Sequence, residues 1–192
     1  NLMLAGNYLH SNILHYYHLA GQDYFRGPDT APFNPRYAQP DLRLSESQNT
    51  LAVDEYIEAL EVRQVCHQLV ALFGGRMPHL QGILAGGAAQ IPDAETILEY
   101  AARMRRVSEF VEKRYLPLVY TIASRYPDMF EMAHGYRNAL CVGVFPLAEP
   151  GTHFFMPGAY IDGHDEPFDG SRILEDVRYS WFAPASSGTP IP

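Results

Sequence analysis

Apolar side chains recur at helical spacing through most of the first 126 residues. Over residues 2–22 they follow the three-to-four-residue period of a helix that is buried on more than one side. A second stripe begins near residue 50, where the side chain of Asn49 or Thr50 is suited to cap a helix. It ends at the glycine pair Gly74 and Gly75, a typical helix stop. The pattern therefore predicts two long helices.

A third helix is predicted from residue 92 toward residue 126. Pro92 fits a first helical turn, and Asp93 and Glu95 face the positive end of the helix dipole. Pro117 lies inside the apolar pattern, and proline removes a backbone donor and clashes with the preceding turn. We expect the helix to bend or divide near Leu116.

The remaining segments lack helical spacing. Residues 23–50 are rich in proline, glycine and asparagine, which predicts irregular coil. After Pro127 the runs VGVFPL and THFFMPGAYIDG alternate with turn residues, which indicates a small antiparallel element, and residues 173–179 fit another short helix or strand. The predicted fold class is mainly α, with long packed helices and a small antiparallel β element with long loops in the C-terminal third. We expect one domain or part of one, with residues 1–126 as a helical core and 127–192 as a mixed strand and loop region.

The connection GGRMPHLQGILAGGA, residues 74–88, is unusual for a link between two helices. Such links are commonly short, yet this one contains five glycines and a proline, and a predicted loop extends to residue 91. Glycine loses more backbone entropy on folding than any other residue, so this composition suggests tight turns or backbone pressed against a neighbour or ligand. The alternative is an ordinary packed crossover that follows a glycine helix stop.

Composition narrows the function classes. Hydrophobic residues make up 47% of the chain and charged residues 19%, which is enough apolar material for a folded core. The net charge of −8 argues against nucleic acid as a partner, because that binding needs clustered lysine and arginine. No run of about 18 apolar residues without charges is present, so no direct membrane span is predicted. The basic group at residues 103–106 lies among acids and is expected on a solvated helix face.

Histidine and cysteine supply the candidate chemistry. His15 and His18 are three residues apart, so an α-helix would place them on one face, as a packed histidine cluster or a two-ligand metal site requires. No acid or cysteine joins them locally, which favours packing. Cys66 lies among apolar residues and is expected in the core. The acids in IDGHDEPFDG, residues 161–170, lack the spacing of a calcium loop and favour a solvated turn.

Arg63 and His67 are four residues apart, so they share a helix face, and the loop returns His79 a dozen residues later. One interpretation is a functional constellation of these three side chains. The other is structural, with Arg63 paired to a neighbouring glutamate and His67 bonded to a backbone carbonyl.

Five segments resemble the large subunit of nickel-iron hydrogenases, in the same order. EALEVRQVCHQLVALFGGRMPHLQGILAGG, residues 58–87, is similar to the family's central signature. NLMLAGNYLHSNILHYYHLAGQDYF, residues 1–25, resembles its helix with a histidine–aromatic–aromatic–histidine pattern. GPDTAPFNPRYAQPDLRL (27–44), GYRNALCVGVFPL (135–147) and ILEDVRYSWF (173–182) resemble later landmarks. Leu80 and Ala85 depart from the pattern, because these positions often carry proline in the family.

The cysteines are the larger departure. The resemblance implies a nickel-iron centre with diatomic ligands, held in the full subunit by four thiolates from two Cys-x-x-Cys motifs. This chain has only Cys66 and Cys141 and no such motif. We therefore expect an internal fragment of a subunit two to three times longer, with one thiolate pair upstream and one downstream, and no ligand to the centre within these residues. A gene-level truncation or a relative without the metal is the alternative.

The resemblance also implies an activity and partners. The full subunit would oxidise molecular hydrogen, as an uptake-type enzyme, and pass electrons to an iron-sulfur small subunit. No catalytic residue is assigned within the chain. The residues implied to wall the cavity around the centre or to support its ligands from behind are Arg63, His67, Pro78, His79, Gly86 and Gly87, with His15 or His18 as a possible proton relay. The alternative function is a metal-free structural or quinone-site subunit related to respiratory complex I. Localisation is left undecided by the sequence.

Overall fold

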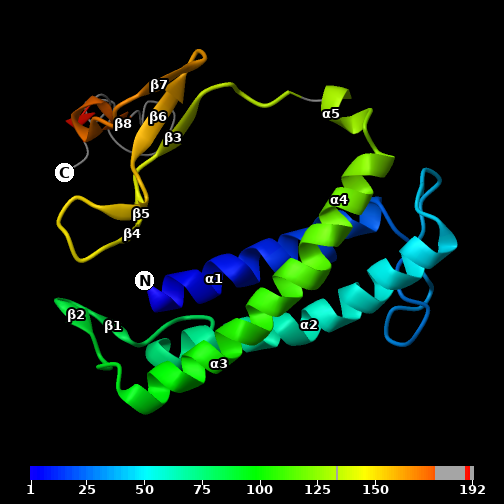
Figure 1. Cartoon of the computed structure of the whole chain (residues 1–192), viewed down its shortest axis with the longest axis horizontal. Coiled ribbons are helices and arrows are strands. Elements are labelled where there is room, and N and C mark those ends of the chain that lie inside the picture. Colours follow the sequence, from blue (N-terminus) through cyan, green and yellow to red (C-terminus); the bar gives the residue numbers. More distant parts are fainter. Residues whose placement is uncertain (133, 176–188, 191–192) are drawn as a thin grey trace. The chain divides into compact units, whose positions relative to one another are not determined.

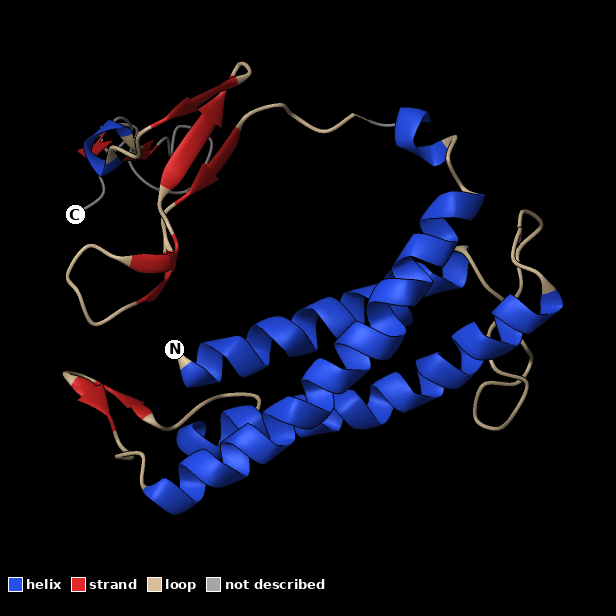
Figure 2. Ribbon diagram, in the orientation of Figure 1, coloured by secondary structure: helices blue, strands red, loops and turns tan. Residues whose placement is uncertain are grey.

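The computed structural model describes residues 1–132, 134–175 and 189–190, and the chain forms two compact units, Asn1–Ala133 and His134–Pro192. Helices build the first unit and short strands build the second (Figures 1 and 2). The mainly helical fold with a small antiparallel β element is confirmed. The helical part extends slightly past Pro127, because one more turn, α5 (Met129–Met132), follows that proline.

The first helical segment changes its winding part-way along. α1 (Leu2–Ile13) is a regular α-helix, η1 (Leu14–Ala20) is a π-helix and η2 (Gly21–Asp23) is a short 3-10 helix. The helix predicted over residues 2–22 is thus confirmed. Its period is not uniform, because π-helical hydrogen bonds span one more residue than α-helical bonds. This difference changes which side chains share a face in η1.

The second helix, α2 (Glu46–Gly74), begins earlier than the sequence predicted. Ser45 is its N-cap, with its hydroxyl accepting from the N–H of Gln48 at 3.3 Å, while the Gln48 side chain accepts from the Ser45 N–H at 3.0 Å. This reciprocal pair is a capping box. The prediction that Asn49 or Thr50 caps the helix was wrong, because the Ser45 pair satisfies the end one turn earlier and Asn49 is buried inside the helix.

The third helical segment is divided where proline predicted a division. α3 (Ala94–Phe110) starts after Asp93, whose carboxylate accepts from the N–H of Thr96 at 2.7 Å. A π-helical turn, η3 (Val111–Tyr115), then separates it from α4 (Leu116–Arg125). Pro117 lies in the first turn of α4, directly after the π-helical turn, where its missing N–H interrupts the α-helical hydrogen bonds.

The helices of the first unit pack around one apolar core. α2 runs back beside α1, and α3 packs against α2 (Figure 1). Tyr17, Phe25 and Tyr126 are large core side chains with almost no exposed surface. Further core residues come from every long helix: Ile13, Ala52, Val62, Leu69, Val107, Phe110, Leu118 and Ile122. Among the described residues, no helix is both long and apolar enough to span a bilayer.

An arginine ties the coil before α2 to the end of α4. Arg43 bonds the carboxylates of Asp41 and Asp128, and its guanidinium lies 4.6 Å from the centre of the Tyr126 ring. The Tyr126 hydroxyl accepts from the Arg43 N–H at 3.0 Å and lies within hydrogen-bonding distance of the Tyr24 and Asp41 carbonyls. The proline-rich segment is irregular, as predicted, but this network fixes its position.

The second unit consists of short antiparallel ladders. β3 (Ala139–Cys141), β6 (Gly158–Ile161) and β7 (His164–Glu166) form one sheet in the order β3-β6-β7. The described part of this unit also contains two antiparallel pairs and one 3-10 helix. These are the pair β4 (Val144–Pro146) and β5 (His153–Phe155), the helix η4 (Gly170–Arg172), and the pair β8 (Leu174–Glu175) and β9 (Thr189–Pro190). The antiparallel prediction is confirmed. Of the segment 173–179, the structure describes β8, and residues 176–179 lie outside the described residues.

Candidate functional site

The glycine-rich loop after α2 folds back onto the end of that helix. Gly75 has φ 76°, a conformation that favours glycine, and its N–H donates to Ala71. The N–H groups of Gln81 and Gly82 both donate to the Gly74 carbonyl, at 2.9 and 3.2 Å. A Cβ on Gly82 would lie 2.2 Å from the Phe73 carbonyl oxygen, so no larger residue fits there without moving the backbone. The loop is therefore anchored, as its glycine content suggested.

Beyond this anchor the loop forms a small exposed hairpin. β1 (Ile83–Leu84) pairs with β2 (Gly87–Ala88) in antiparallel register. Both apolar side chains of β1 are more than half exposed, at 63% and 57%. Pro78, His79, Gly86 and Gly87, the four loop residues proposed for the cavity wall, are also exposed. The hairpin therefore exposes apolar side chains and small residues on its surface.

His79 adopts a backbone conformation that is uncommon for a residue with a side chain. Its φ is 62°, in the left-handed region, and its carbonyl accepts from the Arg76 Nε–H at 2.8 Å. Among the described residues, no hydrogen bond or ring contact joins His79 to Arg63 or His67. The described contacts therefore join Arg63 and His67 to other residues and not to His79, and a shared role for the three side chains stays a prediction. Arg63 lies 11 residues before Gly74, about 16 Å along the helix from the residue where the loop begins.

Arg63 instead joins a group of histidines, which we call the Arg63 cluster, made of His10, His18, Arg63 and His67. Arg63 Nη1 lies 3.4 Å from His18 Nδ1, and Nη2 lies 3.5 Å from His10 Nε2. The rings of His10 and His67 have centroids 4.3 Å apart. His18, Arg63 and His67 were candidates from the sequence. His10 was not, because it lies five residues before His15 and so does not share an α-helical face with it.

The imidazoles of the Arg63 cluster are neutral near neutral pH. Burial, followed by the repulsion that a protonated His67 and the charged Arg63 would exert, lowers the pKa of His10 to about 4. Burial and then Arg63 also lower the pKa values of His18 and His67. Arg63 is therefore the only charged member of the cluster. Within the described residues, the neighbouring glutamates Glu58 and Glu61 pair with Arg114 and Arg106 and not with Arg63.

His18 is fixed in one tautomer by its two neighbours. Its Nε2 lies 3.2 Å from the Tyr56 carbonyl oxygen, which can only accept, so Nε2 carries the hydrogen and Nδ1 accepts from Arg63. His15, by contrast, is exposed and borders a pocket formed with α4 and α5. The prediction that His15 and His18 share a face is therefore wrong, because both lie in the π-helix η1.

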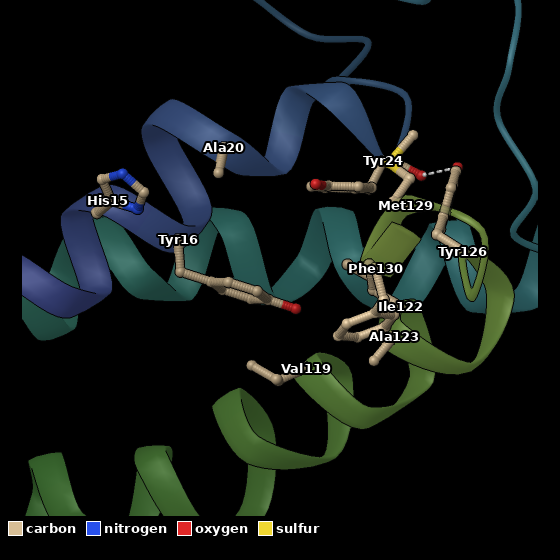
Figure 3. Close-up of a pocket in the computed structure, with 10 residues that line it drawn as sticks. All are labelled: His15, Tyr16, Ala20, Tyr24, Val119, Ile122, Ala123, Tyr126, Met129 and Phe130. Atoms are coloured by element: carbon tan, nitrogen blue, oxygen red, sulfur yellow. Dashed lines mark hydrogen bonds between the residues drawn. The ribbon is translucent and has the colours of Figure 1, made fainter. Parts of the chain in front are cut away.

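That pocket is a mainly apolar hollow with a volume of about 390 Å³. His15, Tyr16 and Ala20 approach it from η1, and Phe130 approaches from α5 (Figure 3). The rest of its lining comes from η2's end and the α4–α5 region: Tyr24, Val119, Ile122, Ala123, Tyr126 and Met129. It contains no acid and no cysteine, so it suits an apolar side chain better than a metal ion or a charged substrate.

A buried acid on α2, Glu55, was missed from sequence. Glu55 is 3% exposed, and the hydroxyl of fully buried Tyr17 donates to its Oε2 at 3.0 Å. Burial raises the pKa of Glu55 to about 7, although the bond from Tyr17 opposes the rise. The available signal was its position: Glu55 falls on the apolar stripe of α2, beside Tyr56, where an acid is unexpected.

Neither cysteine of the chain is placed to ligate a metal centre. Cys66 is fully buried in α2, and burial raises the pKa of its thiol to about 12, which opposes thiolate formation. Cys141 belongs to the other unit. The described residues contain no group of three or more His, Cys, Asp or Glu side chains that could hold a metal ion. These residues do not fit a nickel-iron first coordination sphere.

Comparisons with known proteins identify the family. The family model described as nickel-dependent hydrogenase matches residues 26–192. This chain belongs to the nickel-dependent hydrogenase family. It is 47% identical to the periplasmic NiFeSe hydrogenase large subunit of Desulfomicrobium baculatum over 98% of its own length and 38% of that protein. It is also similar to Hydrogenase-2 large chain of Escherichia coli K12, with 29% identity over 83% of this chain and 32% of that protein.

The fold agrees with the same family. The Ni-Fe-Se hydrogenase of Desulfovibrio vulgaris Hildenborough superimposes with a TM-score of 0.88 and 57% identity, over 99% of this chain and 40% of that chain. A reduced, active form of the Ni-Fe-Se hydrogenase from Desulfomicrobium baculatum gives a TM-score of 0.87. The chain thus has part of the hydrogenase large-subunit fold and spans about two fifths of the length of these relatives.

Proposed function

We propose that the chain is the central part of the large, catalytic subunit of a hydrogenase that oxidises molecular hydrogen to protons and electrons. The observation that carries this proposal is the fold match at 57% identity over 99% of the chain to a Ni-Fe-Se hydrogenase. Together with a small subunit that holds iron-sulfur clusters, the full-length subunit would pass the electrons onward. The relatives named above are all hydrogenase large subunits, and none supports a complex I-like subunit.

The metal centre would be held by residues outside this chain. When bound, a nickel-iron centre with diatomic ligands supplies the chemistry that cleaves hydrogen heterolytically. Because two of the relatives are named as nickel-iron-selenium enzymes, we infer that the centre of the full-length protein is of that type. The tasks left to residues 1–192 are to shape the cavity, exclude water and hold the surrounding helices in place.

The glycine-rich loop is the part of this chain that we place at the cavity. Pro78 and His79 are exposed just before the point where Gly82 anchors the loop to α2, and Gly86 and Gly87 are exposed on the hairpin just after it, so all four can meet a neighbouring surface. Arg63 and His67 lie farther back along α2, within the helices. We assign them to the support of the scaffold, and only indirectly to the cavity.

A proton relay through histidine stays a proposal, with one of the two candidates favoured. His18 uses one ring nitrogen for the Tyr56 carbonyl and the other for Arg63, which suits a fixed link between η1 and α2. His15 is exposed beside the apolar pocket, where its ring is open to other groups. We therefore retain His15 as the relay candidate.

The test is a metal and activity measurement on the intact enzyme. The complete reading frame should encode two Cys-x-x-Cys or selenocysteine-substituted motifs that bracket this segment. The purified two-subunit protein should contain one nickel per large subunit and reduce a redox dye with hydrogen as the electron donor. A full-length protein without nickel, or one that contains nickel but does not reduce the dye with hydrogen, would contradict the proposed function.

A further inference from the structure

We propose that the Arg63 cluster is a carboxylate-binding site that receives one acidic side chain from outside residues 1–192. The cluster joins α1, η1 and α2 through His10, His18, Arg63 and His67. The proposal rests on this chain being part of a longer subunit. It does not depend on the hydrogenase activity.

The first argument is charge. Arg63 is half-buried, and within the described residues no carboxylate pairs with it. The acids nearest to it along α2 already have partners: Glu58 pairs with Arg114, Glu61 pairs with Arg106, and Glu55 accepts from Tyr17. Six other arginines of the described chain have acidic partners: Arg26, Arg43, Arg103, Arg106, Arg114 and Arg172. The remaining described arginines are either exposed or, in the case of half-buried Arg36, donate to a backbone carbonyl at 2.8 Å, whereas Arg63 is half-buried and has only histidine contacts.

The second argument is unsatisfied hydrogen-bonding capacity. Arg63 Nε and His67 Nε2 are both buried, and neither has a hydrogen-bond partner in the described structure. The two residues lie one turn apart on the same face of α2. The contacts that Arg63 does make, at 3.4 and 3.5 Å, are long for hydrogen bonds and involve uncharged acceptors. A guanidinium removed from water is unfavourable unless an anion compensates it.

The third argument is the match between the site and one carboxylate. The planar guanidinium presents parallel N–H groups that suit a carboxylate in bidentate geometry. The three imidazoles are neutral, so one arginine balances one singly charged anion. A phosphate dianion would leave an uncompensated negative charge in the cluster, which makes it the poorer ligand.

The first experiment compares Arg63→Lys with Arg63→Gln in the intact two-subunit enzyme at pH 8, where the histidines of the cluster are neutral. Both substitutions remove the guanidinium, and they differ chiefly in the positive charge. If a carboxylate is bound, the lysine variant should melt higher than the glutamine variant, by roughly 3 °C or more. Equal melting temperatures, or a higher melting temperature for the glutamine variant, would overturn the proposal. Either result would mean that the positive charge at position 63 has no anion to pair with, because loss of an unpaired cation does not destabilise the enzyme.

The matched control is Arg106→Lys against Arg106→Gln. Arg106 pairs with Glu61 at 3.1 Å on the exposed side of α2 and α3. Exposed pairs contribute little, so these two variants should melt within about 1 °C of each other. The control separates the effect of the buried cluster from a general effect of lysine or glutamine on this enzyme.

The second experiment identifies the source of the carboxylate. A carbodiimide joins an amine to a carboxylate in contact with it, and mass spectrometry of the Arg63→Lys enzyme should find a peptide linked to residue 63. A linked acid from the large subunit outside residues 1–192, or from the small subunit, supports the site and names its origin. A link only to an acid within residues 1–192, or no link while Lys113 and Glu109 become joined in the same sample, overturns the proposal. Hydrogen oxidation is not a readout, so failure of the proposed function would be seen separately.

Discussion

At the scale of single residues, Glu55 makes the clearest prediction. Burial raises its pKa from 4.5 to about 7, so folding favours the protonated form. The stability that this group contributes is fully present below pH 4.5 and is lost as the pH rises through 7. Glu55→Gln keeps the shape and removes the ionisation. We expect the variant to gain about 2 kcal/mol on the wild type between pH 5 and pH 8.

The measurement is thermal unfolding of the intact enzyme and its Glu55→Gln variant at both pH values. The control is Glu112→Gln, the same substitution on the exposed side of η3, which should melt as the wild type does. A Glu55→Gln effect that is the same at both pH values would show that Glu55 does not ionise in this range, and the raised pKa would be wrong.

At the scale of elements, Gly82 holds the loop after α2 against that helix, and a substitution there can be compared with one at an uncrowded glycine, Gly135 of the second unit. A Cβ on Gly82 would lie 2.2 Å from the Phe73 carbonyl, whereas a Cβ on Gly135 would meet nothing within 4 Å. Gly82→Ala should therefore destabilise the anchor of the loop by about 1–3 kcal/mol, and Gly135→Ala should be silent. Thermal unfolding of the intact enzyme checks both. Equal melting temperatures for the two variants would mean that the loop is not held against α2 as described.

The same loop shows what sequence could and could not predict. Helix periodicity, the Gly74–Gly75 stop and Pro117 were sufficient to place the long helices, because these signals act locally. Glycine content indicated a constrained loop but not which glycine is crowded. Gly86, singled out from sequence, has open space around its Cα and a φ of 91°, so substitution there strains the backbone without a clash.

Long-range contacts set the limit of the sequence-based predictions. His10 and Arg63 are 53 residues apart, and no local sequence pattern predicts that the packing of α1 against α2 brings them together. The change to π-helix in η1 was equally hidden, and it places His15 and His18 on different sides. The Arg43 network likewise depends on Asp128, which is 85 residues away.

At the scale of the whole molecule, the chain by itself should be inactive. It contains two cysteines, one of them buried with its pKa raised to about 12, and the described residues lack a metal-binding cluster. Purified residues 1–192 should therefore bind no stoichiometric nickel and should not reduce a dye with hydrogen. Large apolar side chains such as Ile91, at 87% exposed, should also make the isolated chain prone to aggregate.

That result would be overturned by stoichiometric nickel or hydrogen-dependent dye reduction in the isolated chain. Nickel content is measured by elemental analysis after gel filtration, so that loosely bound metal is removed. The intact enzyme, prepared in the same way, is the positive control.

The most direct test of the central claim is hydrogen oxidation per bound nickel in the intact enzyme with His79→Ala. If the loop after α2 supports the metal cavity, the rate per nickel should fall by about 10-fold to 100-fold. Glu112→Ala, on the exposed side of η3, should leave the rate unchanged. Normalising to nickel separates failed assembly from failed chemistry. Full activity per nickel in the His79→Ala enzyme would mean that the loop is only a crossover between helices, and would contradict the placement of the cavity at this loop.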